Sequence, residues 1–212
     1  PRQIFNKQMN STNEDVSAQW TDSYQVVNIT NNVLSALAIV DEADRDRVEG
    51  EALFLRSLMF FDLVRFYSQQ YQTGSASTQL GVPLVLTPTR GVTDESYVSR
   101  NSVEEVYNQV IADLIKAASK LPEDNDVYAS IGAANALLAR VYLQKGDYAK
   151  ARDAASTVIE SGLYELMPTY ADVFNNNDNT SEDIFATQIT PQDLSSAMTE
   201  FFSTTQYGGR DG

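Results

Sequence analysis

Two tyrosines, Tyr71 and Tyr97, lie in or beside a long polar segment rich in Gln, Ser and Thr. An aromatic ring can stack on the apolar face of a sugar while amides and hydroxyls nearby bond to the sugar hydroxyls, because a neutral sugar offers no charge to bind. The alternative interpretation is that both are ordinary solvated or half-buried tyrosines. Tyr71 and Tyr97 are therefore the candidate ligand-binding residues, and no motif assigns a particular ligand to either.

Two arginines, Arg56 and Arg65, lie within a segment that is otherwise nearly all apolar. An unpaired buried charge is costly, so each guanidinium must find a carboxylate or a carbonyl group. Glu51 and Asp62 are candidate partners one helical turn away. We expect these arginines to serve in structural ion pairs.

The sequence contains little that indicates a metal site or a catalytic site. The run of Asn and Asp at 175–179 resembles part of a calcium loop, but Thr180 and Ala186 stand where that loop needs Gly and Glu. The chain has no Cys and no His, which excludes thiolate nucleophiles and His-based triads. Paired carboxylates remain the one route to hydrolysis, as in a glycoside hydrolase. We predict no catalytic residue, no metal site and no cofactor.

The overall charge narrows the classes of partner. The 212 residues include 29 acidic and 15 basic side chains, a net charge of -14. Such a surface repels phosphate backbones and anionic headgroups, which argues against nucleic-acid and membrane-surface binding. The longest apolar-rich stretch, 52–66, is interrupted by charges and is too short to span a bilayer. The N-terminus carries no signal-peptide pattern and is typical of a processed start.

Hydrophobic periodicity predicts an all-α protein. The third helix has the clearest signal, because Ser102 and Glu105 form a capping-box pattern ahead of a continuous apolar stripe. Trp20 lies on the stripe of the first helix, where we expect a core role. A charged turn is expected at 41–47 and a short strand at 184–189. The predicted helices cover residues 16–40, 48–67, 102–120, 131–144 and 147–161.

The last two predicted helices favour a tetratricopeptide-like pair joined by a tight turn at Gly146. Small residues would let the two backbones approach closely, while Tyr142 and Tyr148 would fill the space between helix pairs. Helices 48–67 and 102–120 would form a second pair, with 68–101 as a long inserted loop. Loops of this length are often functional, so this one is the first place to look for binding. The small residues are Ala136, Ala139, Ala151 and Ala155.

Six blocks of sequence, in order, resemble the SusD/RagB family along most of the chain. The block that most clearly resembles the family runs from Glu51 to Tyr67. The next block along the chain is Gly81-Val82-Pro83-Leu84-Val85. The other blocks are Trp20 to Leu37, Val103 to Pro122, Ala134 to Tyr148 and Asp172 to Phe185. The resemblance implies a superhelical scaffold of tetratricopeptide-like helix pairs with long irregular loops.

The resemblance also implies a function and a location. Such a protein is a non-catalytic, surface-exposed lipoprotein of the outer membrane, which delivers oligosaccharide to a SusC-like TonB-dependent transporter. The signal peptide and the anchoring Cys are absent from this chain, and family members usually run to more than twice its length. We therefore expect residues 1–212 to form a single N-terminal helical-repeat region of a longer protein.

The residues themselves leave three functions open. The first is the glycan-binding accessory protein that the resemblance implies. The second is a tetratricopeptide-type adaptor whose groove binds a protein or peptide. The third is a glycoside hydrolase, which would need two carboxylates facing each other across a cleft.

Overall fold

The computed structural model describes residues 6, 8, 10, 12–173, 178–188 and 204–207. Its described part contains α-helices, short 3-10 helices and irregular segments, with one isolated β-bridge between Leu80 and Ser102 and no strand. The all-α prediction is confirmed. The α-helices are α2 (Glu14–Ser35), α3 (Glu42–Tyr67), α4 (Val103–Ala118), α5 (Ile131–Lys145) and α6 (Tyr148–Glu160).

The predicted charged turn at 41–47 is wrong from Glu42 onward, because α3 already begins there rather than at Val48. Its first turns need no apolar face, since charged side chains stabilise them. Arg47 pairs with Asp44 and Glu51, each at 3.0 Å. The first predicted helix, in turn, ends five residues early, at Ser35, and a 3-10 turn over Leu37–Ile39 leads toward α3.

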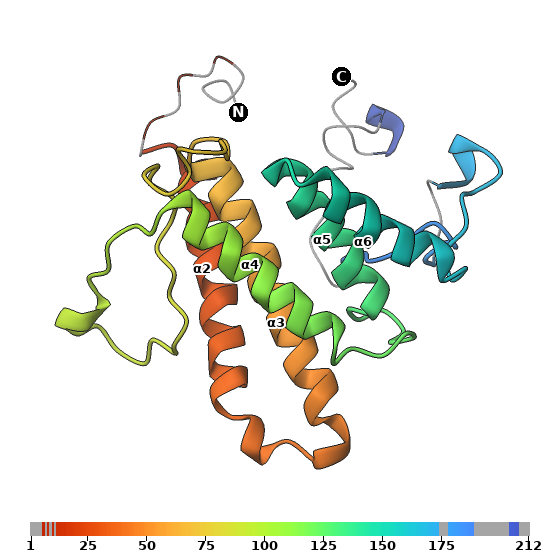
Figure 1. The fold of residues 1–212 in the computed structure, drawn as a ribbon, viewed down its shortest axis with the longest axis horizontal. Coiled ribbons are helices and arrows are strands. Elements are labelled where there is room, and N and C mark those ends of the chain that lie inside the picture. The colour runs from red at the N-terminus through yellow and green to blue at the C-terminus, as the bar shows by residue number, and fades with distance from the viewer. Residues whose placement is uncertain are drawn as a thin grey trace.

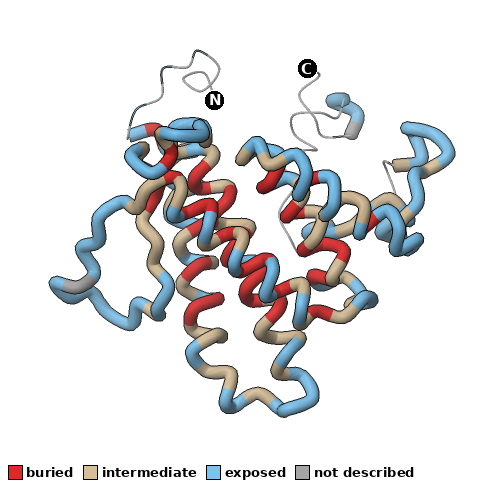
Figure 2. The backbone as a smooth tube through the Cα atoms, viewed as in Figure 1, coloured by how far each residue is buried: buried red, intermediate tan, exposed pale blue. Residues whose placement is uncertain are grey.

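The helices pack in sequential pairs: α2 on α3, α3 on α4, α4 on α5 and α5 on α6 (Figure 1). The predicted pairing of the second and third helices is therefore confirmed. Buried residues concentrate where these helices face one another, as Figure 2 shows, and α3 lies at the centre. Phe60, Phe61, Leu63 and Val64 of α3 are each at most 1% exposed. The apolar segment of α3 is thus the central, buried helix of the scaffold.

The turn between α5 and α6 has the predicted geometry. Gly146 adopts a left-handed conformation with φ of 82°, and its N–H donates to carbonyl groups at the end of α5. Ala151 and Tyr142 are buried, as expected for a close helix pair. Tyr148 is 71% exposed, so its predicted role between helix pairs is wrong for the described part of the chain. Its place at the first residue of α6 turns the ring toward solvent.

After α6 the chain returns along the scaffold. The Tyr164 ring lies directly against Gly132, where a Cβ atom would collide with it, and its hydroxyl bonds with Ser130 at 3.1 Å. Phe185 then packs edge-on against Phe54 of α3 at 4.9 Å. The predicted strand at 184–189 is wrong over 184–188, because Phe185 is anchored on a helix and no neighbouring strand pairs with this part of the chain.

No helix within the described ranges is long and apolar enough to cross a membrane.

Candidate functional site

A hollow of about 240 Å³ opens where α3, α4 and α5 meet the start of the long loop. The end of α3 supplies charged and apolar side chains, the loop supplies two glutamines, and α5 supplies a third. Amide groups beside aromatic rings are the combination that binds neutral, hydroxyl-rich molecules. The lining residues are Val64, Arg65, Phe66, Gln69, Gln70, Tyr107 and Gln144.

Tyr71 borders this hollow through its contact with Tyr107. The two rings lie 5.0 Å apart at an interplanar angle of 59°, and the Lys145 ammonium lies 5.5 Å from the Tyr71 ring centre. The Tyr107 hydroxyl bonds with Oε1 of Gln144 at 3.2 Å. Tyr71 is half-buried, which is compatible with both interpretations of this residue, and its role in ligand binding stays a prediction.

Both tyrosines keep their protons at physiological pH. Burial raises the pKa of Tyr107 to about 12, against a partly opposing charge on Arg65. Burial also raises the pKa of Tyr71, and the nearby carboxylate of Glu104 raises it further. Neutral phenols can both donate and accept hydrogen bonds. Tyr107 is only 3% exposed, so the accessible aromatic surface and uncharged hydroxyl group come from the half-buried Tyr71.

Arg65 and Phe66 form the side of the hollow toward α3. Arg65 pairs with Asp62 at 3.1 Å, as predicted, and its guanidinium lies 5.1 Å from the centre of the Phe61 ring. Burial raises the pKa of Asp62, although the charges of Arg65 and Arg140 oppose the shift. Phe66 is 63% exposed, a second aromatic surface that the sequence analysis did not single out. Its position at the end of a helix, just before a polar loop, was the feature of the sequence that could have indicated an exposed ring.

Tyr97 lies elsewhere on the long loop. It directly follows the 3-10 turn η2 (Asp94–Ser96), at the part of the loop that stands away from the helices (Figure 1), and it is 82% exposed. Tyr71, by contrast, packs on the helical body through Tyr107. The structure therefore places the two predicted tyrosines in different parts of the surface.

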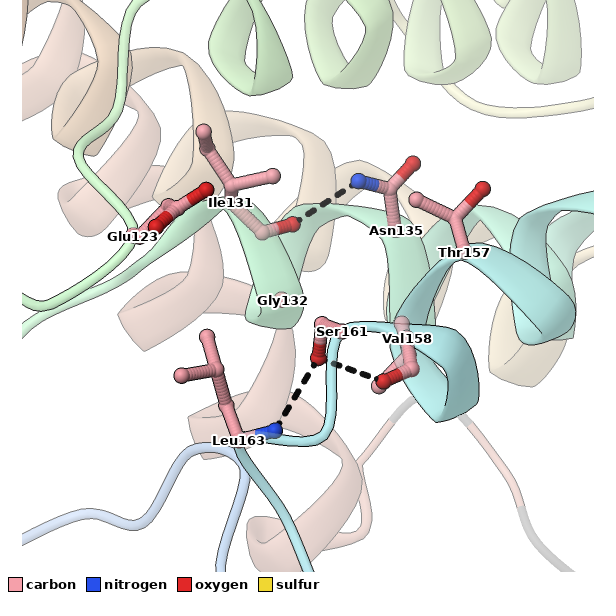
Figure 3. A pocket seen from close by; sticks show the side chains of 8 residues that line it. All are labelled: Glu123, Ile131, Gly132, Asn135, Thr157, Val158, Ser161 and Leu163. Carbon is pink, nitrogen blue, oxygen red and sulfur yellow. Dashed lines mark hydrogen bonds between the residues drawn. The ribbon is translucent and has the colours of Figure 1, made fainter.

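A second hollow, of about 180 Å³, lies between α5, α6 and Leu163 (Figure 3). Its polar side chains are largely committed to the backbone. The Asn135 amide donates to the Ile131 carbonyl at 3.0 Å, and the Ser161 hydroxyl donates to the Val158 carbonyl at 2.7 Å. The residues that line it include no aromatic ring. This hollow is therefore a seam between helix ends, and the hollow beside Tyr71 is the better candidate site.

The comparison with protein families decides the class of protein. Residues 2–143 match the SusD-like family, described as starch-binding and associating with the outer membrane.

The chain belongs to the SusD-like family.

A SusD-like protein of Bacteroides ovatus is 28% identical over an alignment 207 residues long, which covers 89% of this chain and 36% of the relative. The SusD-like chain described here thus spans little more than a third of that relative's length. The family match and this relative confirm the family that the sequence predicted.

Solved structures of SusD-like proteins share the fold. A SusD superfamily protein from Bacteroides fragilis superposes with a TM-score of 0.83 at 25% identity, over 92% of this chain and 46% of that one. A crystal structure with xylogluco-oligosaccharide matches with a TM-score of 0.80 at 26% identity, over 96% of this chain and 42% of that one. The helical scaffold is therefore that of the SusD superfamily.

Membership in the SusD-like family also bears on chemistry, because it is a family of non-catalytic binding proteins. The prediction that the chain is not an enzyme is confirmed by this membership, and the glycoside-hydrolase alternative is set aside. Groups of three or more His, Cys, Asp or Glu suited to a metal are absent from the described residues. Asn175 and Asn177 of the considered calcium run lie outside those residues.

Proposed function

We propose that this protein captures oligosaccharide at the outer membrane and passes it to a SusC-like TonB-dependent transporter. In this proposal it is held at the cell surface by a lipid anchor outside this chain. Support comes from the family, whose description combines starch binding with the outer membrane, and from the similar structure with xylogluco-oligosaccharide. Because the chain spans only about a third of its relatives, the ligand and the partner remain part of the proposal.

The observation that carries the proposal is the half-buried Tyr71 ring, which packs on the buried Tyr107 beside a glutamine-lined hollow. A sugar ring could stack on an aromatic face there while amide groups bond to its hydroxyls. The surface charge of the hollow also suits a neutral ligand, because Arg65 is already paired with Asp62. Tyr97 offers a further aromatic surface at the loop tip.

Isothermal titration of the full-length protein with xyloglucan and starch oligosaccharides tests the proposal. We expect Tyr71→Ala to weaken binding about tenfold, the loss of roughly 1.4 kcal/mol. Tyr97→Ala should weaken it less, because that ring stands apart from the hollow. Tyr128→Ala, which removes another exposed ring, is the matched control and should leave affinity unchanged. Unchanged affinity in Tyr71→Ala would contradict the assignment of the hollow as the site.

A second candidate function is that of a protein-binding adaptor. It is favoured by apolar side chains exposed on α6, where Ile159 is 76% exposed and Tyr148 is 71% exposed. Affinity capture from solubilised outer membranes, with and without added oligosaccharide, separates the two. Recovery of a TonB-dependent transporter supports the leading proposal, whereas stable capture of another protein without sugar supports the adaptor.

A further inference from the structure

Side chains on one face of α2 form hydrogen bonds with the backbone of an extended strip of the long loop, residues 83–89. Tyr24 donates its hydroxyl to the Pro83 carbonyl at 2.8 Å. Asn28 accepts from the Thr89 N–H at 2.7 Å and donates to the Thr89 carbonyl at 3.2 Å. Residues spaced by four along a helix share a face, and alternate residues of an extended chain point the same way. The strip 83–89 is therefore aligned along α2 by polar contacts with its main chain.

Asn31 lies in the middle of this contact and is only 1% exposed. Its side-chain N–H groups donate to the carbonyl groups of Val85 at 2.8 Å and Thr87 at 3.3 Å. Its Oδ1 accepts from Nη1 of Arg56 at 2.9 Å. Because a guanidinium has no acceptor, the amide must turn its oxygen toward Arg56 and its nitrogen toward the loop. The orientation of Asn31 is thus determined from inside the core.

The guanidinium of Arg56 is itself held in place. It donates two hydrogen bonds of 2.8 Å to the two carboxylate oxygens of Asp113, and Gln109 donates to Asp113 at 2.9 Å. Both side chains of the ion pair are less than 10% exposed. A buried pair of this kind is weak evidence for stability by itself, and its best-supported role is to select one arrangement among several.

We propose that Asn31 sets the register of the 83–89 strip on α2, and that the Arg56–Asp113 pair positions the loop through it. A slip by one residue would remove the Val85 and Thr87 carbonyls from the Asn31 amide and turn every side chain of the strip to the opposite side. The register determines where the segment 90–99, which carries Tyr97, leaves the body of the protein. The loop register does not depend on what the protein binds; only its effect on affinity rests on the proposed function.

Amide hydrogen exchange of the Asn31→Asp variant tests the proposal. The carboxylate keeps the shape and the acceptor for Arg56 but removes both N–H donors. We expect the Thr89 N–H, which bonds to Asn28 and not to Asn31, to exchange at least about tenfold faster, while amides of α5 keep their rates. Asn32→Asp is the matched control, because the Asn32 amide donates within α2, to the Asn28 carbonyl at 2.8 Å. Its Thr89 exchange should stay near the wild-type rate.

Two results would overturn the proposal: an unchanged Thr89 rate in Asn31→Asp, or an equal acceleration in α5, which marks Asn31 as a general stability residue. If Asn31→Asp does not fold, Arg56→Lys decides, since lysine keeps the charge beside Asp113 but loses the hydrogen bond that Nη1 of Arg56 donates to Asn31. Its Thr89 N–H should also exchange faster, and an unchanged rate refutes the coupling. No ligand enters these measurements, so an absence of oligosaccharide binding would leave their outcome intact.

Discussion

The N–H of Gly81 donates to the carbonyl of Asn101 at 2.7 Å, which closes the part of the long loop between these two residues at a narrow neck. The contact is close because Gly81 has no side chain. A Cβ atom there would lie 2.9 Å from the Asn101 carbonyl oxygen and 2.9 Å from backbone atoms of Ser102. Arg100 reinforces the neck by donating to the carbonyl groups of Gly81 and Tyr67, each at 2.5 Å.

Gly81→Ala should therefore lower the free energy of unfolding by about 1–3 kcal/mol, because rigid backbone must move to admit the methyl group. Gly91→Ala, in the same loop, meets no atom within 4 Å and should change the value by less than about 0.5 kcal/mol. Urea unfolding followed by circular dichroism measures both. Equal effects of the two substitutions would show that the neck is not tightly packed.

Removal of one partner from the Arg56–Asp113 pair should be strongly destabilising. Asp113→Ala leaves a buried guanidinium without its carboxylate, with an expected loss of about 3–5 kcal/mol. The double variant Arg56→Met with Asp113→Leu removes both charges, so it should recover most of that loss. The measurement is the unfolding free energy of the single and double variants. A double variant as unstable as Asp113→Ala would rule out unpaired charge as the cause.

The Glu49 carboxylate predicts a specific pH dependence. Burial alone would raise its pKa, but Lys116 and Lys120, at 2.5 and 2.9 Å, outweigh burial and lower the pKa below the ordinary value of 4.5. The unfolded chain then binds the proton more tightly, so the stabilisation is present above pH 4.5 and is lost as the pH falls through the lowered pKa.

Wild type should accordingly be more stable than Glu49→Gln at pH 7, and the difference should shrink as the pH falls below 4.5. Unfolding free energies measured from neutral to acidic pH test this. A difference that stayed constant with pH would mean that the Glu49 charge is not what stabilises the fold.

The α5–α6 turn depends on the left-handed conformation of Gly146. An alanine at φ of 82° is strained, so Gly146→Ala should cost about 1–2 kcal/mol. Gly146→Asn should cost less, because Asn adopts this conformation more readily. Thermal unfolding of the two variants gives the comparison, and an order reversed from this one would point to a turn that rearranges.

Local chemistry made several elements predictable from sequence. Ser102 accepts from the Glu105 N–H at 3.2 Å, and the Glu105 carboxylate accepts from the Ser102 N–H at 2.7 Å, as the capping-box pattern predicts. The Gly146 turn and the Arg65–Asp62 pair likewise involve residues close in sequence. Trp20 is half-buried and packs at 4.9 Å from Tyr24, consistent with the predicted core role.

Contacts between distant residues could not be predicted in the same way. Arg56 pairs with Asp113, 57 positions away, rather than with Glu51 or Asp62 as expected. The spacing on one helix shows which neighbours are in reach, but only the packing of α3 on α4 brings Asp113 closer than either. The same limit applies to the candidate site, where Tyr71 was predicted but its contacts with Tyr107 and Lys145 were not.

The loop is held to the body by the neck at Gly81 and by the polar contacts along α2, and residues 90–94 and 96–99 beyond these contacts are exposed. Exposed tips of this kind tolerate replacement and insertion better than the segments that hold them. Substitution within 90–99 can therefore alter the aromatic surface that Tyr97 presents while the Tyr71 hollow keeps its shape. A SusD-like scaffold built in this way can exchange one short stretch of exposed chain without disturbing the helices that hold it.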